Sequence, residues 1–289
     1  LMRADEPADL VHEVFSEALF PDHPVGREVL GDERTITAMG RADIADFHAL
    51  HYRPGNIVFA AAGQLEHAAV VEGIERRFAG AAGGAAPDRS VPTAAPQPLA
   101  VDSRPTEQVH LVMGVRSLDR HDEDRYALSV VNHVLGGGLS SRLFQKVREE
   151  RGLAYSVYSY RSAYADTGSL AVYAGTAPAR VDEVLHIVRA EMDEMTATGI
   201  TERELDVAKG HLIGELALAL EDSAARMSRI GRHQLVHGSV LSVEEVVARI
   251  AAVTLDDAAR VAAQVLGNER VLAVVGPVDE DAFDTPRVA

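Results

Sequence analysis

The residues best suited to chemistry lie together near the middle of the chain. Gly136, Gly137 and Gly138 are consecutive, and glycine allows either a positive φ or a close approach of other backbone. Ser140 and Ser141 follow, and then come a short charged segment and a tyrosine-bearing run. Such a glycine loop can hold a phosphate, accommodate a substrate backbone or allow tight packing, and an activated serine can act as a nucleophile.

The flanking sequence narrows these alternatives. The glycines lack the Gly-Lys-Ser/Thr ending of a nucleotide-binding loop, and Lys146 is in the wrong position to replace it. Neither serine lies in a G-x-S-x-G motif, and either can cap the helix that follows. We therefore favour substrate binding for the glycine loop, with tight packing as the alternative, and capping for the serines.

Regular elements on both sides must position this loop. The expected apolar stripe of the helix after it comprises Leu139, Leu143, Phe144 and Val147. Gly152 is placed to end that helix in a left-handed conformation. Alternation over residues 154–160 predicts a strand, which we expect to pair with a second strand over 170–176 as a hairpin with a long loop.

The rest of the chain alternates between helical and strand patterns. Capping boxes at Thr201/Glu204 and Ser242/Glu245 open two further helices. Apolar spacing predicts helices over residues 7–19, 41–51, 67–78, 122–134 and a long one from 178 to Gly199. The remaining predicted strands cover residues 57–63, 108–115 and 271–276.

Composition excludes several classes of function. The chain has 289 residues, a formal net charge of −16 and no cysteine. A strongly acidic chain is poorly suited to nucleic acid or an anionic membrane, and the lack of cysteine excludes disulfides and thiolate metal sites. No apolar run reaches the ~20 residues of a membrane span. We expect a cytoplasmic protein without a nucleic-acid or membrane partner.

An internal repeat indicates two related halves. Residues 36–63 and 250–276 both read as an acid-capped helix followed by an apolar stretch ending in glycine. We expect residues 1–80 to form the C-terminal portion of a first domain, 81–100 a linker, and 101–289 a second domain. The repeat implies that about 115 residues precede this chain in the whole protein, so residues 1–80 should leave strand edges unpaired or apolar faces exposed.

Three segments resemble one family. The run from Pro21 to Arg27, the run from Phe47 to Asn56, and the stretch from Gly136 to Tyr155 are similar to pitrilysin/insulinase-type zinc peptidases, which include the mitochondrial processing peptidase. The resemblance implies an α+β fold of two homologous domains, each a mostly antiparallel sheet covered by helices, that close on an extended peptide. It also implies that the first domain is incomplete here.

The zinc motif of this family is not found in the chain. Such enzymes bind Zn²⁺ through H-x-x-E-H, whose Glu activates water, and through a later Glu. None of the twelve histidines has that spacing with a Glu, so we expect no metal site in this chain and zinc only in the full-length protein. Glu6, Glu13 and Glu17 lie near the expected third ligand. His48 and His51 form an H-x-x-H pair, which we interpret as a helix end.

The resemblance also assigns roles to two residues in the second half. Members of the family use an Arg and a Tyr, seven residues apart, to reach the substrate and its oxyanion. Arg148 and Tyr155 match that spacing and context. A guanidinium and a phenol can stabilise the negative oxygen that forms when water attacks a peptide bond. The alternative is a solvated charge on a helix and a tyrosine packed on a strand.

The sequence therefore predicts a zinc metalloendopeptidase that hydrolyses extended peptides between two domains, although the chain alone should be inactive. A homodimer or a heterodimer is compatible with this hypothesis. The rival is a non-catalytic, substrate-binding partner subunit of a heteromeric peptidase of the same family. A third reading, a scaffold without a peptide role, leaves Arg148 and Tyr155 unexplained. The presence of H-x-x-E-H upstream would decide between the first two.

Overall fold

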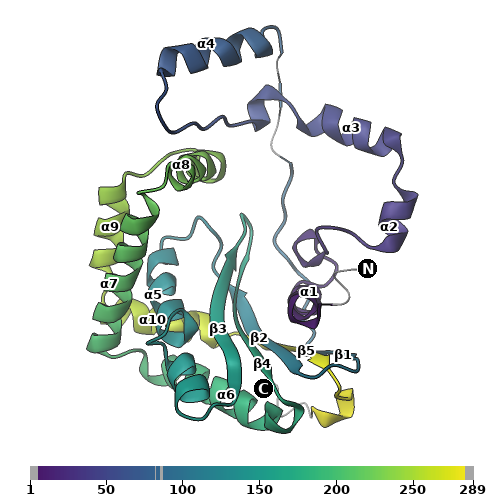
Figure 1. Cartoon of the computed structure of the whole chain (residues 1–289), viewed down its shortest axis with the longest axis vertical. Helices are drawn as coiled ribbons and strands as arrows, with labels where there is room; N and C mark the ends of the chain where they lie inside the picture. The colour runs from purple at the N-terminus through teal and green to yellow at the C-terminus, as the bar shows by residue number, and fades with distance from the viewer. Residues whose placement is uncertain (1–5, 82, 85–86, 284–289) are drawn as a thin grey trace. The chain divides into compact units, whose positions relative to one another are not determined.

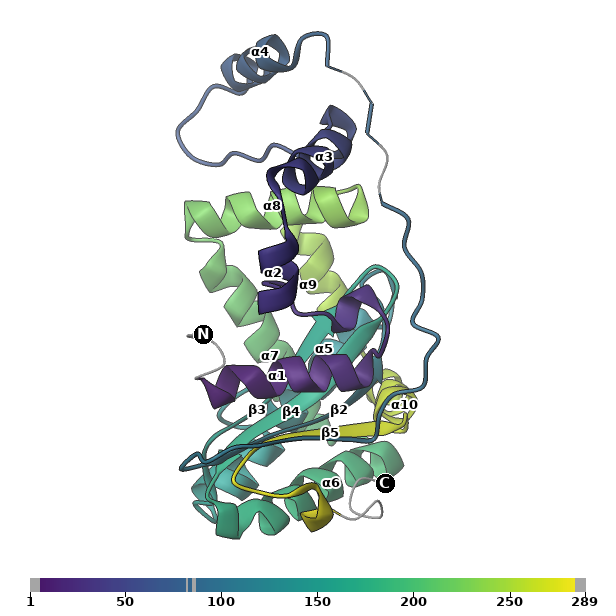
Figure 2. The same ribbon diagram turned by 90° about the vertical axis from the view of Figure 1, so that its right-hand side faces the viewer.

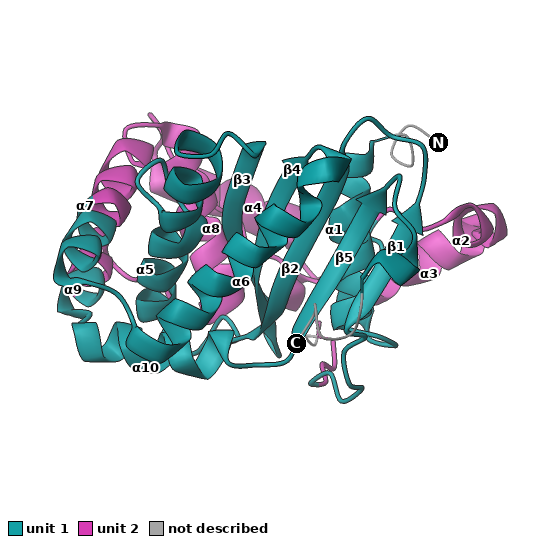
Figure 3. Ribbon diagram, turned by 90° about the horizontal axis from the view of Figure 1, so that it is seen from below, with its two compact units in different colours: residues 1–29, 91–210, 249–289 teal, residues 30–90, 211–248 magenta. Residues whose placement is uncertain are grey.

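The computed structural model describes residues 6–81, 83–84 and 87–283. They fall into two compact units (Figure 3). The first, which we call the sheet unit, covers residues 6–29, 91–210 and 249–283. The second, the helical unit, covers residues 30–81, 83–84, 87–90 and 211–248.

The sheet unit is built on a five-stranded mixed sheet with the order β1-β5-β2-β4-β3 (Figure 1). β1 runs parallel to β5, and the other neighbouring pairs are antiparallel. The strands are β1 (Leu99–Ser103), β2 (Val109–Ser117), β3 (Ala154–Ala163), β4 (Gly168–Thr176) and β5 (Arg270–Gly276). The predicted α+β class, four of these strands and the β3–β4 hairpin are confirmed. β1 was not predicted, because its pattern is too short to distinguish from a loop.

Helices cover both faces of this sheet. On one face α5 packs against β3, α6 against β4 and α10 against β2. On the other face α1 crosses β5, β2 and β1 (Figure 2). The bounds are α1 (Pro7–Leu19), α5 (Arg125–Gly136), α6 (Val181–Thr198) and α10 (Leu255–Leu266). Because both faces are covered, β4 and β5 are buried nearly throughout and read as continuous apolar runs.

α1 shows how the sequence positions a helix on the sheet. Pro7 occupies its first turn, where a missing N–H costs nothing, and its apolar residues recur on one face. Val11, Phe15 and Leu19 are at most 2% exposed and pack with Val112 of β2 and Ala273 of β5. The predicted helix is confirmed, but its packing on a sheet formed by residues beyond 98 is a long-range contact that local periodicity cannot show.

The helical unit is assembled from short helices. It contains α2 (Glu33–Ala38), α3 (Arg41–His51), α4 (His67–Phe78) and α8 (Ser223–His237), and it shares α7 (Glu202–Ala219) and α9 (Val243–Ala252) with the sheet unit. Large apolar side chains that are more than half exposed include Leu30, Ile36, Ile44, Phe47, Leu50 and Phe59. The exposed apolar faces expected for residues 1–80 are therefore present in residues 30–80, whereas α1 is well covered.

One predicted strand does not form. Residues 57–63 have the apolar pattern of a strand but adopt no regular structure, and no strand lies beside them among the described residues. A strand needs a neighbour to bond its N–H and C=O groups, so an apolar pattern alone is not sufficient. The sequence prediction for this stretch was wrong for that reason.

Candidate functional site

The glycine loop begins where α5 ends. A Cβ atom on Gly136 would lie 2.5 Å from the backbone nitrogen of Ser159 in β3, and one on Gly138 would lie 2.9 Å from Cε1 of His133. None of the three glycines, Gly136 to Gly138, has a positive φ. Their small size is therefore needed for close approach to the chain's own atoms. Their assignment as substrate-binding residues stays a prediction.

The segment after the loop forms a short π-helix, which is wider than a regular α-helix. The Ser141 hydroxyl accepts a hydrogen bond from the backbone N–H of Phe144 (3.4 Å), which confirms a capping role, and a π-helix runs over Phe144–Glu149. Leu143 and Val147 are fully buried, whereas Leu139 is 73% exposed and does not belong to the expected inner stripe. Such wide turns are frequent at functional sites.

Arg148 and Tyr155 are brought together by this arrangement. The Arg148 guanidinium carbon lies 4.7 Å from the centre of the Tyr155 ring and 4.9 Å from that of Phe144. Both distances are within the range of a cation–π interaction. The Tyr155 side chain is largely in solvent, since the residue is 80% exposed, and Arg148 has a nearby carboxylate in Glu149, at 3.8 Å. An exposed phenol and a guanidinium therefore sit side by side.

Two backbone features aim Tyr155 at Arg148. Gly152 adopts a φ of 58°, as the sequence predicted, and turns the chain back so that the N–H of Leu153 bonds the carbonyl of Val147 (2.9 Å). A register shift between Ala154 and Ser156 leaves Tyr155 without a partner on β4. This is a β-bulge on the outermost strand, and bulges commonly redirect a side chain next to a functional site.

Buried ion pairs fix the helix that carries Arg148. The Arg142 guanidinium donates to both carboxylate oxygens of Glu204 in α7, at 2.6 and 2.9 Å, and its side chain is only 11% exposed. One turn later, Lys146 bonds the buried carboxylate of Glu191 in α6. These contacts hold the segment against two helices that precede and follow Gly199 in the chain.

The same contacts set the charge state of Glu204. Burial alone would raise the pKa of its carboxyl, but hydrogen bonds from Arg142 and from the backbone and hydroxyl of Thr201 lower that pKa to about 2. The Glu204 hydrogen bond also raises the pKa of Arg142. The sequence predicted only the Thr201/Glu204 capping box, which is confirmed (N–H to Oε2, 2.7 Å). Arg142 was missed, because its partner lies 62 positions away.

The described residues do not provide a zinc site. No three His, Cys, Asp or Glu side chains are grouped so that they could hold a metal ion anywhere in this described part of the chain. The H-x-x-H pair in α3 is engaged elsewhere: the His48 ring stacks on Tyr52 (4.6 Å) and the His51 ring lies against Phe47 (4.4 Å). The residues present therefore do not fit the metal that the family resemblance implies.

Among the described residues, no helix combines the length and the apolar character that a membrane span requires.

A sequence profile described as the inactive domain of peptidase M16 matches residues 38–212. The chain is 43% identical over 289 residues to an uncharacterized zinc protease of Streptomyces coelicolor. This match covers 96% of the present chain and 62% of the Streptomyces protein. A similarly named zinc protease of Bacillus subtilis is 34% identical over 277 residues, covering 96% of this chain and 67% of that protein.

Solved structures agree with this likeness. A crystal structure of a peptidase M16 inactive domain from Pseudomonas fluorescens superposes with a TM-score of 0.88 at 26% identity, covering 96% of this chain and 67% of that one. A protease from Helicobacter pylori has a TM-score of 0.82 at 19% identity, covering 94% and 68%, and shares the fold. The chain thus spans about two thirds of the length of the proteins that it matches.

Proposed function

Because the chain belongs to the peptidase M16 family, we propose that it forms part of a zinc-dependent endopeptidase and contributes Arg148 and Tyr155 to peptide binding. We also propose that the catalytic metal is held elsewhere in the whole protein, which the match to an inactive-type domain supports. An extended peptide as substrate, a cytoplasmic location and assembly as a homodimer or heterodimer are part of the same proposal.

One observation supports this proposal above the others. The Arg148 guanidinium lies over the ring of an exposed tyrosine, on a helix that buried ion pairs hold in place. Exposed aromatic rings and arginines that are fixed before a ligand arrives lose little side-chain entropy on binding. The register shift in β3 leaves Tyr155 without a partner on β4, and such bulges often redirect a side chain next to a functional site.

The two side chains have complementary chemistry for a peptide. Arg148 and Tyr155 both donate hydrogen bonds, and a peptide carbonyl oxygen accepts them. When water attacks the carbonyl carbon, that oxygen gains negative charge, and the two donors bind it more strongly than they bind the ground state. Stabilisation of the oxyanion is therefore the role that we assign to the pair, with no proton transfer through either group.

Zinc belongs to the proposal for the whole protein only. The relatives are named zinc proteases, and we propose that the full-length protein also uses zinc. The residues described here contain no site for it, so the 289-residue chain alone should not hydrolyse an unfolded peptide. Turnover by this chain that is sensitive to a chelator would contradict the assignment.

The roles of Arg148 and Tyr155 can be tested in a protein extended to the length of its relatives. We expect Arg148→Ala and Tyr155→Phe each to lower kcat for an unfolded fluorogenic peptide by about 10²–10³-fold, the usual effect of removing one oxyanion donor. Arg180→Ala and Tyr52→Phe are matched controls on exposed residues and should leave kcat unchanged. Equal activity of all four variants would exclude the pair from catalysis.

A second candidate function is supported by the match to a domain that is described as inactive. In this alternative the whole protein is a non-catalytic subunit that holds peptide for a partner peptidase. The discriminating measurement is zinc content of the full-length protein together with peptide binding. One bound zinc per chain supports the enzyme, whereas peptide binding that needs Arg148 in a protein without zinc supports the subunit.

A further inference from the structure

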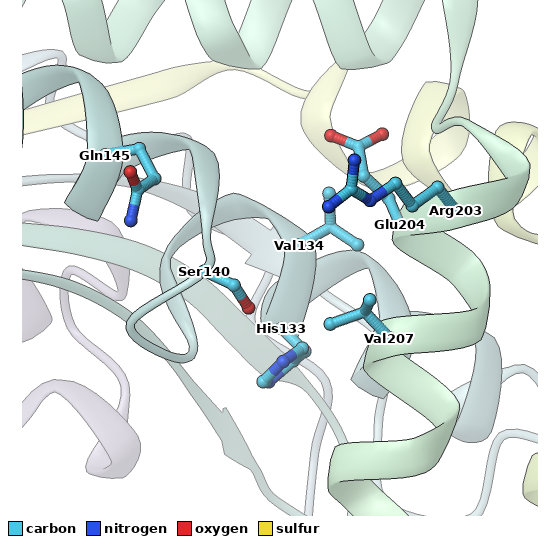
Figure 4. A pocket seen from close by; sticks show the side chains of 7 residues that line it. All are labelled: His133, Val134, Ser140, Gln145, Arg203, Glu204 and Val207. Carbon is cyan, nitrogen blue, oxygen red and sulfur yellow. The ribbon is translucent and has the colours of Figure 1, made fainter.

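A cavity of about 290 Å³ lies beside the glycine loop, within the sheet unit. Figure 4 shows side chains from α5 and the loop on one side and side chains from α7 on the other. Neither Arg148 nor Tyr155 lines this cavity, so it is distinct from the pair described above. Its lining includes His133, Val134, Ser140, Arg203, Glu204 and Val207.

Two opposite charges lie next to each other on the α7 wall. The Glu204 carboxylate is held in place by Arg142 and by the Thr201 N–H, and these bonds keep it ionised. The neighbouring Arg203 is exposed and makes no ion pair with any acidic side chain of the described chain. The cavity is therefore lined by a carboxylate that is already paired with Arg142 and by the Arg203 guanidinium, which forms no ion pair within the described residues.

The remaining walls suit a small ligand with an apolar portion. Val134 of α5 and Val207 of α7 face the same space, and the hydroxyl of Ser140 lies at the loop side (Figure 4). The ring of His133 is 5% exposed and forms part of the buried wall. A volume of about 290 Å³ is at the lower end of the range for small-molecule sites, so the occupant must be small.

We propose that this cavity binds a small zwitterion of the free amino acid or dipeptide class. The carboxylate of the ligand is bound by Arg203, and its side chain packs between Val134 and Val207. Its ammonium group is bound by Oε1 of Glu204, the oxygen that accepts from Arg142 alone, whereas Oε2 already accepts three hydrogen bonds. Arginine favours carboxylates because its fork of N–H donors matches both oxygens. The proposal rests on this cavity alone and holds whether or not the whole protein is a peptidase.

A ligand bound in the cavity should change the environment of the glycine loop. The His133 ring that lines the cavity also packs against Gly138, where a Cβ atom would lie only 2.9 Å from it. A ligand that contacts the ring therefore changes the surroundings of the Gly138 amide. This gives a local readout that does not depend on enzyme activity.

The test is a titration of the ¹⁵N-labelled 289-residue chain with the dipeptide Ala-Leu, followed by NMR. We expect saturable shifts at the amides of Val134, Gly138 and Val207, with a dissociation constant of about 1 mM for a ligand of this size. Arg203→Ala should weaken binding at least about tenfold, because a charge-assisted hydrogen bond is lost. Val207→Trp should abolish binding by filling the cavity, while Arg180→Ala, on another helix, should have no effect.

Two further ligands test whether binding depends on both charges of the dipeptide. N-acetyl-Ala-Leu-amide has the same two side chains without either charge and should not bind. Inorganic phosphate should bind at least tenfold more weakly than Ala-Leu. Equal binding of the blocked peptide would show a merely apolar site, and equal binding of phosphate a general anion site. Either result, or no shift with 10 mM Ala-Leu at about ten times the expected dissociation constant, overturns the proposal.

Discussion

β5 and residues 57–63 are the two copies of one sequence pattern, yet only β5 is a strand. β5 lies between β1 and β2 and is buried along almost its whole length. Residues 57–63 lack a neighbouring strand in the described part of the chain, and Phe59 is 54% exposed. An apolar stretch with a strand pattern therefore becomes a strand only when adjacent strands exchange backbone hydrogen bonds with it.

The helices that accompany the two copies extend this comparison. α1 precedes the first copy and packs on β5, in the sheet unit. α8 precedes the second copy and lies near residues 57–63, in the helical unit: a Cβ atom on Gly231 would be 2.9 Å from Cβ of Ala60. The helix that precedes each copy thus packs on the strand, or on the strand-like stretch, of the other copy.

Hydrogen exchange should show the largest difference between the copies. Amides of β5 can exchange only through opening of the buried sheet, whereas those of residues 58–63 are outside regular structure. We expect exchange at least about 10³-fold slower in β5. Mass spectrometry of peptic peptides from the two segments measures this, and equal protection would show that the stretch forms a strand in solution.

Matched phenylalanines should differ strongly in their contribution to stability. Phe15 of α1 is 2% exposed, and its truncation to alanine leaves a cavity in the core beneath the helix. We expect Phe15→Ala to lower the free energy of unfolding by about 3–5 kcal/mol. Phe47→Ala in α3, at a residue 59% exposed, should change it by less than about 0.5 kcal/mol. Urea denaturation followed by circular dichroism compares them, and a similar loss in both would mean that α3 is covered in solution.

Ion pairs in the two units should differ by a smaller amount in their contribution to the free energy of unfolding. Glu204→Gln removes an acceptor of the mostly buried Arg142 guanidinium and should cost about 1.5–3 kcal/mol at pH 7. Glu72→Gln breaks an exposed pair with Arg76 in α4 and should cost at most about 0.5 kcal/mol. Urea denaturation of both variants tests this contrast.

The Glu204 effect should also depend on pH with a defined sign. The pKa of this carboxyl is lowered in the folded state, from 4.5 to about 2, so its contribution is complete above pH 4.5. It is then lost as the pH falls from about 4.5 to about 2. The gap in unfolding free energy between wild type and Glu204→Gln should therefore shrink over that interval, and a gap that stays constant or widens would contradict the ion pair.

Glycine-to-alanine substitutions should have the smallest effects on stability. The effect should be destabilising in the sheet unit and stabilising in the helical unit. A Cβ atom on Gly114 in β2 would lie 2.6 Å from the Leu170 carbonyl oxygen, so Gly114→Ala should cost about 1–3 kcal/mol. A Cβ atom on Gly73 in α4 would meet only Arg77, at 3.5 Å, so Gly73→Ala should stabilise the helix by about 0.5–1 kcal/mol. Thermal melting of both variants shows the signs, and destabilisation by both would mean that α4 is packed in solution.

The site was predicted in part because some of its features are local. Gly152 ends a helical segment in the left-handed conformation, and Ser141 caps the segment before it, as the residue types indicated. Glycine allows a positive φ, but none of Gly136 to Gly138 adopts one. At Gly136 and Gly138 a small residue is needed instead because Ser159 and His133 lie close by. The spacing of Arg148 and Tyr155 indicated a pair, but only the bulge in β3 explains how they meet.

Features that depend on neighbours in the chain could be predicted from the amino-acid sequence: helix periods, caps, turns and the alternation of the strands. These features arise from backbone sterics and local hydrogen bonds. The three-dimensional structure was needed to see that α1 covers the sheet, that Arg142 pairs with Glu204, and that residues 57–63 do not form a strand. Each of these depends on groups that are distant in sequence, and the free energy of burying or pairing them is not encoded in any short stretch.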